Sequence, residues 1–353
     1  MFNCPLVYVV LVNYKNWYDT IECLNSLFHL SYANFKVIVV DNHSQDDSIE
    51  QIKNWPKSKY SLPKTEILYQ QNIVSSASSQ PLVSSQVINS SKLDDAVPDH
   101  HNLILVESDK NLGFAGGNNI GIKLALKNKA DYVWFLNNDT VVEHNTLCHL
   151  VNHSESENSL IKKLGIIGSK LLYYHNPNNI QALLGRYRPI TATTEHIGLN
   201  NKDSLDSEIV SINQNDYIVG ASMFVSAEFI KEVGFMSEEY FLYFEELDWV
   251  KRGQKYGYTI DVCKKSRVYH KEGASIGGSI KHNNNKSELS DIYSIRNRII
   301  ITRKYYTLYL PTVYFSLIFV IINRIKRRQF RRLPLIFKIV LESFKSRKVG
   351  IFR

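Results

Sequence analysis

The sequence predicts an α/β fold in which helices pack on an open parallel sheet. Short apolar runs rich in Val, Ile and Leu alternate with segments of helical periodicity between residues 6 and 139. Runs of this kind are typical of strands buried on both faces of a parallel sheet. Strands that alternate with helices indicate right-handed βαβ units. The composition is that of a globular chain, because 44% of the residues are hydrophobic and 22% are charged.

The expected elements follow one another along the chain. Strands are expected at residues 6–12, 37–40, 103–106 and 132–136. A first helix should begin at Asn16, with Asp19 three residues on in the manner of a capping box. Ser44 with Asp47 should open a second helix, and residues 115–126 form a third. The pattern then weakens, and it supports a strand at 217–225, a helix at 246–256 and a strand that ends at His270.

One segment interrupts this alternation. Residues 57–102 are rich in Ser, Asn, Gln and Pro and lack sustained periodicity. Such a segment is more often an inserted loop than a separate domain. We therefore expect a main domain over residues 1–284 with a flexible insertion at 57–102, followed by a basic and apolar helical region over 285–353.

The basic charge is concentrated at the C-terminal end. Residues 296–353 hold 15 Lys and Arg but one acid, Glu342, and so carry +14. The total of +8 leaves the rest of the chain at −6. A basic end on an acidic body predicts an anionic partner, either lipid headgroups or nucleic acid. No nucleic-acid-binding motif accompanies the charge, so we expect no nucleic acid partner.

The apolar stretch at residues 308–322 suggests how this region is used. It covers about 15 residues, fewer than the ~20 that cross a bilayer as a helix. Because six cations follow between Arg324 and Arg332, we expect residues 305–353 to bind the cytoplasmic membrane surface without spanning it. The alternative is a helical pair that packs on the main domain or on the second subunit of a homodimer.

The cysteines and the N-terminus indicate the compartment. Cys4, Cys23, Cys148 and Cys263 are scattered without a CxxC pair, as is typical of buried reduced thiols. The N-terminal apolar run lacks a preceding basic segment, and Asn13 interrupts it, which is unlike a signal peptide. We expect a cytoplasmic protein, peripheral on the inner face of the cell membrane.

Polar residues end three of the expected strands, at Asn13-Tyr14, Asp41-Asn42 and Asn137-Asn138-Asp139. Each alone could simply cap the next helix. Together they lie along the sheet edge where open α/β folds bind ligands. Asp41 could accept hydrogen bonds from a nucleobase or ribose. Asp139 could share a Mg²⁺ or Mn²⁺ ion with substrate phosphates, since hard cations take oxygen ligands.

Two further segments carry candidate chemistry. The loop 111–119 (NLGFAGGNN) offers glycines for close backbone approach and a helix N-terminus for an anion, but it lacks both GxGxxG spacing and the P-loop lysine. Residues 241–249 (FLYFEELDW) pack Glu245, Glu246 and Asp248 among aromatics at a helix start. These acids suit a general base or a metal neighbour, or form an ordinary charged first turn. His270 is either a ligand or a common core histidine.

Taken in order, these segments resemble a known family. VVLVNYKNW, KVIVVDNHSQDDS, NLGFAGGNN, YVWFLNNDT, YIVGASMFV, YFLYFEELDW and VYH are similar to segments of family 2 glycosyltransferases, above all the bacterial rhamnosyltransferase-type enzymes of surface polysaccharide synthesis. The resemblance covers residues 6–272 and continues weakly through Arg296-Asn297-Arg298. It implies a Rossmann-like nucleotide-binding sheet of the glycosyltransferase A type, with residues 1–284 as the catalytic domain.

The resemblance also implies roles for individual residues. The backbone around Val12, Asn13 and Tyr14 and the side chain of Asp41 would hold the base. Residues Gly116, Gly117 and Asn118 would line the nucleotide sugar, as would Asn138 in the metal motif. Asp139 stands at the last position of the family's DxD motif, and His270 matches a histidine that helps bind the divalent metal. Glu246 aligns with the general base, with Glu245 before it and Asp248 as the following acid.

The chain departs from the family pattern at two places. Asn137 and Asn138 replace carboxylates, and Glu at 245–246 replaces the commoner Glu-Asp pair, so the choice of base among Glu245, Glu246 and Asp248 stays open. The implied reaction is a single inverting transfer from a nucleotide-diphosphate sugar, with dTDP-rhamnose foremost, to a glycan or lipid-linked acceptor. The alternative is a non-catalytic, membrane-associated protein of the same fold that binds sugar nucleotides.

Overall fold

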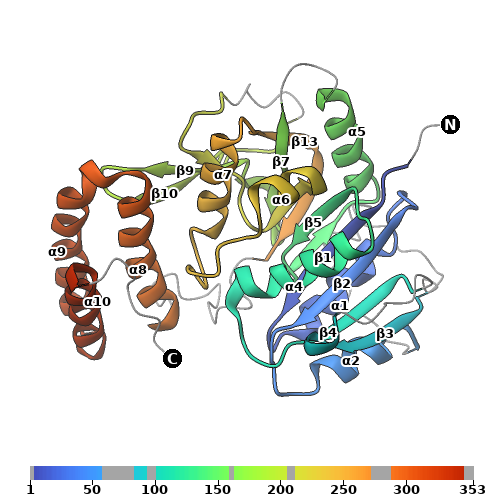
Figure 1. The fold of residues 1–353 in the computed structure, drawn as a ribbon, viewed down its shortest axis with the longest axis horizontal. Coiled ribbons are helices and arrows are strands. Elements are labelled where there is room, and N and C mark those ends of the chain that lie inside the picture. The colour runs from blue at the N-terminus through green and yellow to red at the C-terminus, as the bar shows by residue number, and fades with distance from the viewer. Residues whose placement is uncertain are drawn as a thin grey trace.

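The computed structural model describes residues 4–57, 83–93, 101–158, 163–204, 211–271 and 288–345. Within those residues ten strands form one mixed sheet, in the order β3-β4-β2-β1-β5-β12-β7-β13-β6, with β8 paired to β7 (Figure 1). One half is parallel and consists of β1 (Val7–Asn13), β2 (Phe35–Asp41), β3 (Ser85–Asn89), β4 (Leu103–Glu107) and β5 (Tyr132–Leu136). The predicted α/β fold with a largely parallel central sheet is confirmed.

Helices cover both faces of the sheet. On one face, α1 (Trp17–Leu27), α2 (Ser48–Asn54) and α5 (Thr146–Asn158) pack on residues such as Val9 of β1. On the other, α4 (Gly113–Lys127), α6 (Ala227–Val233) and α7 (Glu245–Lys255) pack on the alternate residues, such as Val10. Successive side chains of a strand point to opposite faces, so a fully apolar strand such as β1 serves both layers.

The second half of the sheet mixes strand directions. Antiparallel β12 (Ser222–Ser226) joins β5 to β7 (Leu164–Tyr173), and β13 (Thr259–His270) runs parallel to β7 and antiparallel to β6 (Thr140–Val142). The remaining strands are β8 (Asn176–Ala182) and a small sheet of β9 (Leu184–Arg188), β10 (Thr193–Ile197) and β11 (Asp216–Tyr217). The pairing of β13 with β6 brings His270 opposite Thr140, next to the end of β5.

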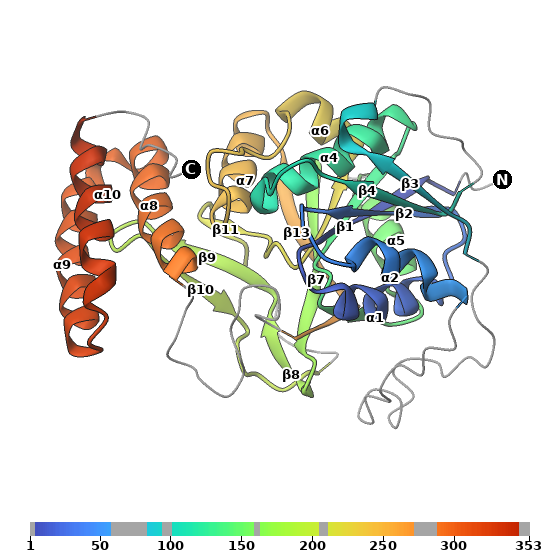
Figure 2. The same cartoon turned by 90° about the horizontal axis from the view of Figure 1, so that it is seen from below.

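Three helices complete the described chain: α8 (Glu288–Tyr305), α9 (Leu310–Lys326) and α10 (Leu333–Lys345). They form the end of the molecule that lies opposite β3, and α8 lies between the sheet domain and α9 (Figures 1 and 2). The helical C-terminal region is therefore present as predicted. The predicted boundary between residues 284 and 285 falls outside the described residues.

The structure corrects the prediction for the insertion. Part of segment 57–102, predicted to be a flexible loop, forms strand β3, which pairs in parallel with β4 from Ser85 to Asn89. This edge strand has only two consecutive apolar residues, Val87 and Ile88. A short edge strand that pairs with one neighbour needs few apolar residues, so its hydrophobic alternation is hard to recognise in a polar segment. Residues 58–82 and 94–100 lie outside the described part of the chain.

Three local predictions also need correction. The expected strand 217–225 is split into β11 and β12, which join different sheets, because the chain turns at Gly220. Ser44 opens no helix: it binds Asp41 instead, and α2 begins at Ser48. Asn16 occupies the N-cap position of α1, but its amide donates to Asp19 rather than accepting from the backbone.

The apolar segment near the C-terminus is longer than the sequence analysis predicted. The helical stretch Thr307–Lys326 covers 20 residues and has the length and composition of a membrane-crossing helix. The prediction from residues 308–322 that it is too short is therefore wrong, because the helix begins before that run and continues past it. Length and composition alone are weak evidence for a span, since core helices can meet the same criteria.

Candidate active site

The polar side chains at the carboxyl ends of β1 and β2 are joined to each other in one network of hydrogen bonds. The Asn13 amide donates to Asp41 Oδ1 at 2.8 Å and accepts from Thr20 Oγ1 at 2.8 Å. The Ser44 N–H donates to Asp41 Oδ2 at 3.0 Å, and the Ser44 hydroxyl donates to Oδ1. Asn13 is fully buried, whereas its neighbours Val12 and Tyr14 are partly exposed. This edge is thus fixed by its own hydrogen bonds.

The glycines of α4 serve packing. A side-chain carbon on Gly117 would lie 2.9 Å from Val12 Cγ1, and one on Gly116 would lie 2.5 Å from Leu112 Cβ. The two positions therefore let the helix approach β1 and its own preceding loop closely. Asn118 is buried, and its amide donates to the Phe114 carbonyl at 3.0 Å. The predicted contact of these three residues with a nucleotide sugar stays a prediction.

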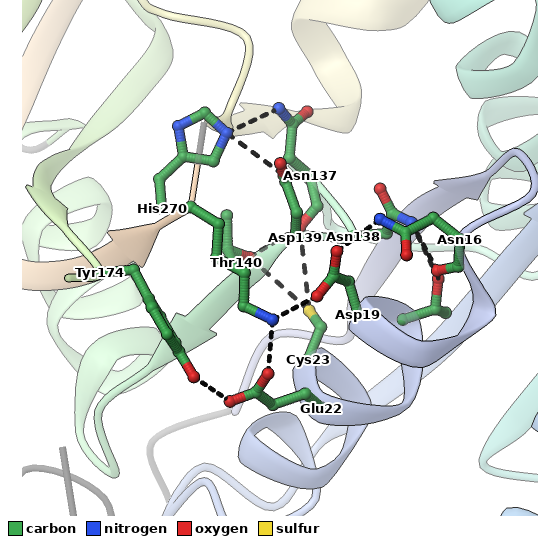
Figure 3. A network of polar contacts seen from close by, with 12 residues as sticks. Asn16, Asp19, Glu22, Cys23, Asn137, Asn138, Asp139, Thr140, Tyr174 and His270 are labelled. Carbon is green, nitrogen blue, oxygen red and sulfur yellow. Dashed lines mark hydrogen bonds and ion pairs between the residues drawn. The ribbon is translucent and has the colours of Figure 1, made fainter. Parts of the chain in front are cut away.

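A second polar cluster joins the end of β5 to the end of β13 (Figure 3). Asp139 is 3% exposed, and its Oδ1 lies 3.2 Å from His270 Nε2. Burial alone would raise the pKa of Asp139, but the charge and proximity of His270 lower it overall. The Asn137 amide also approaches His270 Nε2, at 3.3 Å. The predicted pair Asp139 and His270 is thus brought together from residues far apart in sequence.

The hydrogen bonds of His270 assign its tautomer. Its Nδ1 lies 2.8 Å from Oε1 of buried Gln181, which can only accept, so Nδ1 carries a proton. In the neutral imidazole Nε2 is then an acceptor that faces Asp139 Oδ1. Within the described residues, Asp139 Oδ1 has no hydrogen-bond partner of good geometry. A buried carboxylate oxygen and an imidazole lone pair that face each other need a cation between them or a proton on Nε2.

This arrangement fits a divalent metal. Two ligands on adjacent corners of an octahedral shell lie ~3 Å apart, close to the 3.2 Å between Asp139 Oδ1 and His270 Nε2. Gln181 behind His270 orients the ring in the way that second ligand shells do. Among the residues described, no three His, Cys, Asp or Glu side chains form a metal cluster. The described residues therefore offer two ligands, and the remainder of the shell would come from elsewhere, for example from substrate oxygens and water.

Asn138 and Lys271 tie this cluster to α1. The Asn138 amide donates to Thr20 Oγ1 at 2.9 Å, so this residue, predicted to bind substrate, holds α1 against β5. Lys271 forms ion pairs with Asp19 and Glu22 of α1, and Tyr174 also donates to Glu22 (Figure 3). These partners were not predicted from the sequence, in which the cation directly after His270 is their one signal. They fix the end of β13, which carries His270.

The loop before α7 has an unusual backbone. Phe241, Tyr243 and Phe244 all have positive φ angles of 60°, 71° and 74°. Such angles cost free energy in non-glycine residues and persist only where the surroundings enforce them. The Phe114 N–H at the start of α4 donates to the Phe241 carbonyl at 2.8 Å. The loop therefore abuts the glycine-rich segment of α4.

Helix α8 enforces this loop conformation. The buried Asn297 amide donates to the carbonyls of Tyr240, Leu242 and Tyr243 at 2.7, 2.8 and 3.1 Å. Arg296 donates to the Glu239 carbonyl at 2.9 Å and to Asn297 Oδ1 at 2.7 Å. The only signal for this contact in the sequence was the weak continuation of the resemblance through Arg296-Asn297-Arg298.

Glu245 and Glu246 begin α7 with carboxyl groups that are poorly satisfied. Each has a buried Oε2 that finds no hydrogen-bond partner among the described residues. Burial raises the pKa of Glu246 to about 7, with backbone N–H groups of Glu246 and Phe244 acting against it. Burial and the neighbouring Glu246 raise the pKa of Glu245 well above its ordinary value. Glu245 is buried, whereas Glu246 is partly exposed.

Asp248, on the same helical turn, is in the opposite situation. It is fully buried and binds Arg252 Nε at 2.8 Å, Lys304 Nζ at 2.5 Å and the hydroxyls of Tyr305 and Tyr240 at 2.8 and 3.1 Å. Burial alone would raise its pKa, but Lys304 and Arg252 lower it overall. A carboxylate with four donors is a poor proton acceptor, so the geometry gives Asp248 the task of joining α7 to α8.

A tight turn separates the two carboxylate regions. A side-chain carbon on Gly220 would lie 3.7 Å from Glu246 Oε1 and 3.4 Å from the Phe114 ring. The carbonyl of the next residue, Ala221, accepts from the Asn137 N–H at 3.0 Å. Glu246 therefore lies on one side of the Gly220-Ala221 turn, and the Asn137–Asp139 segment lies on the other.

Comparison with known proteins identifies the family of the chain. The family model of glycosyl transferase family 2 matches residues 8–72 and 89–207, more than half of the chain. The chain belongs to glycosyl transferase family 2. The match includes the strand ends at Asn13, Asp41 and Asp139, and the α7 carboxylates lie beyond it.

Two family 2 relatives are similar to part of the chain. The low-salt glycan biosynthesis hexosyltransferase Agl10 of Haloferax volcanii is 22% identical over 174 residues, which are 49% of this chain and 53% of Agl10. The dTDP-rhamnosyl transferase RfbF of Shigella flexneri is 25% identical over 233 residues, which are 64% of this chain and 73% of RfbF. The chain thus spans about half the length of the first relative and about three quarters of the second.

Solved structures match the chain at low sequence identity and with TM-scores below 0.5. TarS of S. aureus has a TM-score of 0.46 and 13% identity, covering 84% of this chain and 39% of TarS. The mannosyltransferase PcManGT of Pyrobaculum calidifontis, in complex with GDP-Man and Mn²⁺, has a TM-score of 0.49 and 10% identity, covering 97% of this chain and 88% of PcManGT.

Proposed function

We propose that this family 2 protein transfers a sugar from a nucleotide-diphosphate donor to a hydroxyl group of a glycan or lipid-linked acceptor, with inversion at the anomeric carbon. Family membership and two relatives named as sugar transferases support the reaction class. The rhamnosyl transferase among them favours dTDP-rhamnose as donor, with UDP-hexoses next. Surface polysaccharide synthesis is the process in which such a transfer would be used.

One observation carries the proposal: Glu246 is a partly exposed residue whose buried Oε2 has no hydrogen-bond partner among the described residues and whose pKa is raised to about 7. A general base works best when its pKa lies near the operating pH, because it is then both ionised and basic. Glu245 is buried and Asp248 is bonded to four donors. We therefore assign the base to Glu246 and a positioning role to Asp248.

The reaction needs one displacement. The acceptor oxygen forms a bond to the anomeric carbon while the bond from that carbon to the diphosphate oxygen breaks, and the nucleoside diphosphate leaves with the electron pair. Glu246 takes the acceptor proton. The Gly220-Ala221 turn lies beside Glu246, because a side-chain carbon on Gly220 would lie 3.7 Å from Glu246 Oε1. Attack from the face opposite the leaving group inverts the configuration.

Asp139 and His270 would hold a Mg²⁺ or Mn²⁺ ion, as the facing Oδ1 and Nε2 atoms support. A bound divalent cation supplies positive charge where negative charge builds on the departing diphosphate. The chain's own contribution is to keep the two ligands in place: Gln181 orients the His270 ring, and Lys271 fixes the end of β13 against α1. Asn138 fixes the end of β5 in the same way.

The test is a product analysis with full-length protein, a panel of nucleotide sugars and a lipid-linked acceptor. We expect release of nucleoside diphosphate from one donor, with dTDP-rhamnose first, and a new glycosidic bond whose anomeric configuration, read by NMR, is opposite to that of the donor. Retention of configuration would overturn the single displacement. Tight donor binding with no turnover of any donor would favour the non-catalytic sugar-nucleotide-binding protein instead.

A further inference from the structure

Helices α9 and α10 expose large apolar side chains in regular stripes. On α9 the stripe consists of Phe315, Ile318, Phe319 and Ile322, and on α10 of Phe337, Leu341 and Phe344. The spacings of three and four residues place each set on one face of its helix. Phe315 is 62% exposed and Phe344 is 68% exposed. Water-exposed aromatic stripes of this extent mark a surface that another body covers.

The opposite faces of both helices are packed inside the protein. Val313 and Leu317 of α9 and Ile336 and Ile339 of α10 are buried in the core. Tyr314 of α9 contacts Ser343 of α10, with the two hydroxyl oxygens 2.9 Å apart. The exposed stripes therefore belong to amphipathic helices that are already packed on α8. These helices lie at the end of the molecule away from β3 (Figure 2).

The cations between the two helices divide into two groups. Arg324 and Arg332 both bind the buried carboxylate of Asp291, at 2.5 and 3.3 Å, so they hold the helices to α8. By contrast, the side chains of Lys326, Arg327, Arg328 and Arg331 are exposed around the turn that joins α9 to α10. The basic surface predicted from the sequence is thus smaller than six residues, and it adjoins the apolar stripes.

We propose that the outer face of α9 and α10, with the basic turn between them, lies on the surface of an anionic lipid bilayer. Apolar side chains that insert among acyl chains, next to cations that meet lipid phosphates, provide the two signals that stable peripheral attachment needs. The positive charge of the turn favours an anionic lipid bilayer over a second copy of the chain. A second copy docked face to face through the same surface would add a second set of these four exposed cations to the interface.

The packing also favours attachment over spanning. Thr307–Lys326 is long enough to cross a bilayer. To do so, however, α9 would have to leave α8 and α10 and lose its buried residues and the Tyr314 contacts. It would also carry Arg324 away from Asp291. If α9 lies in the interface between lipid and water instead, all of these contacts remain, and only its exposed apolar stripe becomes buried.

The attachment would set the position of the active site. The same helix α8 on which α9 and α10 pack holds the loop before α7 through Asn297 and holds Asp248 through Lys304. The membrane face and the α7 carboxylates are therefore parts of one packed unit. The inference does not rest on the proposed activity, because binding to lipid is measured without donor or acceptor.

The experiment is sedimentation of the full-length protein with vesicles of phosphatidylcholine alone or mixed with phosphatidylglycerol. We expect binding to the anionic vesicles at low salt and a decrease as salt is added. Phe315→Ser with Phe319→Ser, and separately Arg328→Glu with Arg331→Glu, should each weaken binding about tenfold or more. These positions are exposed, so circular dichroism and melting temperature should stay at wild-type values.

Matched controls lie elsewhere on the surface. Leu199→Ser removes an exposed apolar residue, and Lys123→Glu with Lys231→Glu reverses two exposed charges on α4 and α6, so neither should alter binding. Full-length protein that ignores anionic vesicles, or stripe variants that bind like wild type, would overturn the proposal. So would lipid-bound protein that only detergent releases, which indicates a span. If the protein forms dimers without lipid and the Phe315→Ser, Phe319→Ser variant does not, the face binds a second copy of the chain instead.

Discussion

The strand side and the helix side of the candidate active site differ in how their polar groups are satisfied. On the strand side, Asn13, Asp41 and Asn138 are buried and bond to one another or to α1 from regular strand ends. On the helix side, the loop before α7 has three non-glycine residues with positive φ, and Glu245 and Glu246 each keep a buried oxygen without a partner in the described structure. Apart from Asp139 Oδ1, the strand side is satisfied by its own hydrogen bonds within the described residues, whereas the helix side combines strained backbone angles with two unpartnered carboxyl oxygens.

This difference supports our proposal that the strand side binds the donor and the helix side supplies the base. A side whose polar groups are already bonded can present a fixed surface to a nucleotide without rearrangement. A carboxyl group that is buried without a partner is a stronger base than one in water, because burial disfavours its charged form. Strain of this kind persists only if the surrounding structure supplies the stabilisation, and here the support comes from Asn297 on α8.

The largest effect is expected at the base. Glu246→Gln keeps the size of the side chain but removes the proton acceptor, so turnover should fall ~10²–10⁴-fold while donor binding stays near normal. Glu245→Gln is the matched control and should fall much less, because burial already favours its protonated form, which Gln resembles. Kinetics and donor titration measure both. Turnover of Glu246→Gln within a few-fold of wild type would move the base elsewhere.

The next effect concerns the metal ligands. Asp139→Ala should weaken the Mn²⁺-dependent part of donor binding by at least tenfold, because loss of a metal ligand or of its orienting partner costs ~10–100-fold in metal affinity. His270→Ala should weaken it less. Glu107→Ala is the control, because Glu107 is an exposed carboxylate at the end of the neighbouring strand β4. Calorimetry with and without Mn²⁺ is the measurement. Full activity in excess chelator would remove the metal from the proposal.

The support from α8 gives the third prediction. Asn297→Asp retains the shape of the side chain but loses the N–H donors to three loop carbonyls. The free energy of unfolding should therefore fall by ~1–3 kcal/mol or more, and turnover should fall as well. Asn323→Ala on the exposed part of α9 should change neither. Denaturant midpoints and kcat report the two effects. Reduced stability with normal turnover would show that the loop conformation does not matter for the reaction.

The smallest effect is the pH dependence. Because Glu246 must be ionised to accept a proton, kcat should rise with pH and level off above about 7, a change of ~tenfold from pH 6. The stability of the folded protein should move the other way: because folding raises the pKa of Glu246 from 4.5 to about 7, the folded state becomes less stable as pH rises between these two values and then stays level. At pH 8 Glu246→Gln should therefore melt at a higher temperature than wild type. A flat pH profile would contradict the assignment.

The sequence by itself determined the parallel half of the sheet and the residues at its edge. Apolar runs such as 37–40 and 132–136 reflect burial on both faces, a local property, and the polar residues after them fall on one edge in any open parallel sheet. That reasoning reached Asp41 and Asp139 without the structure. It failed for β3, because an edge strand in a polar segment requires only a few apolar residues.

Only the tertiary structure distinguished residues of the same type. Glu246 and Asp248 lie on one helical turn, yet Lys304 and Tyr305 from α8 bond to Asp248, and Glu246 Oε2 finds no such donor in the part of the chain described. The same holds for Arg331 and Arg332, of which one is exposed and the other binds buried Asp291. Neighbours in sequence share a local pattern, but the proton affinity and accessibility of a charged group depend on partners that only folding brings to it.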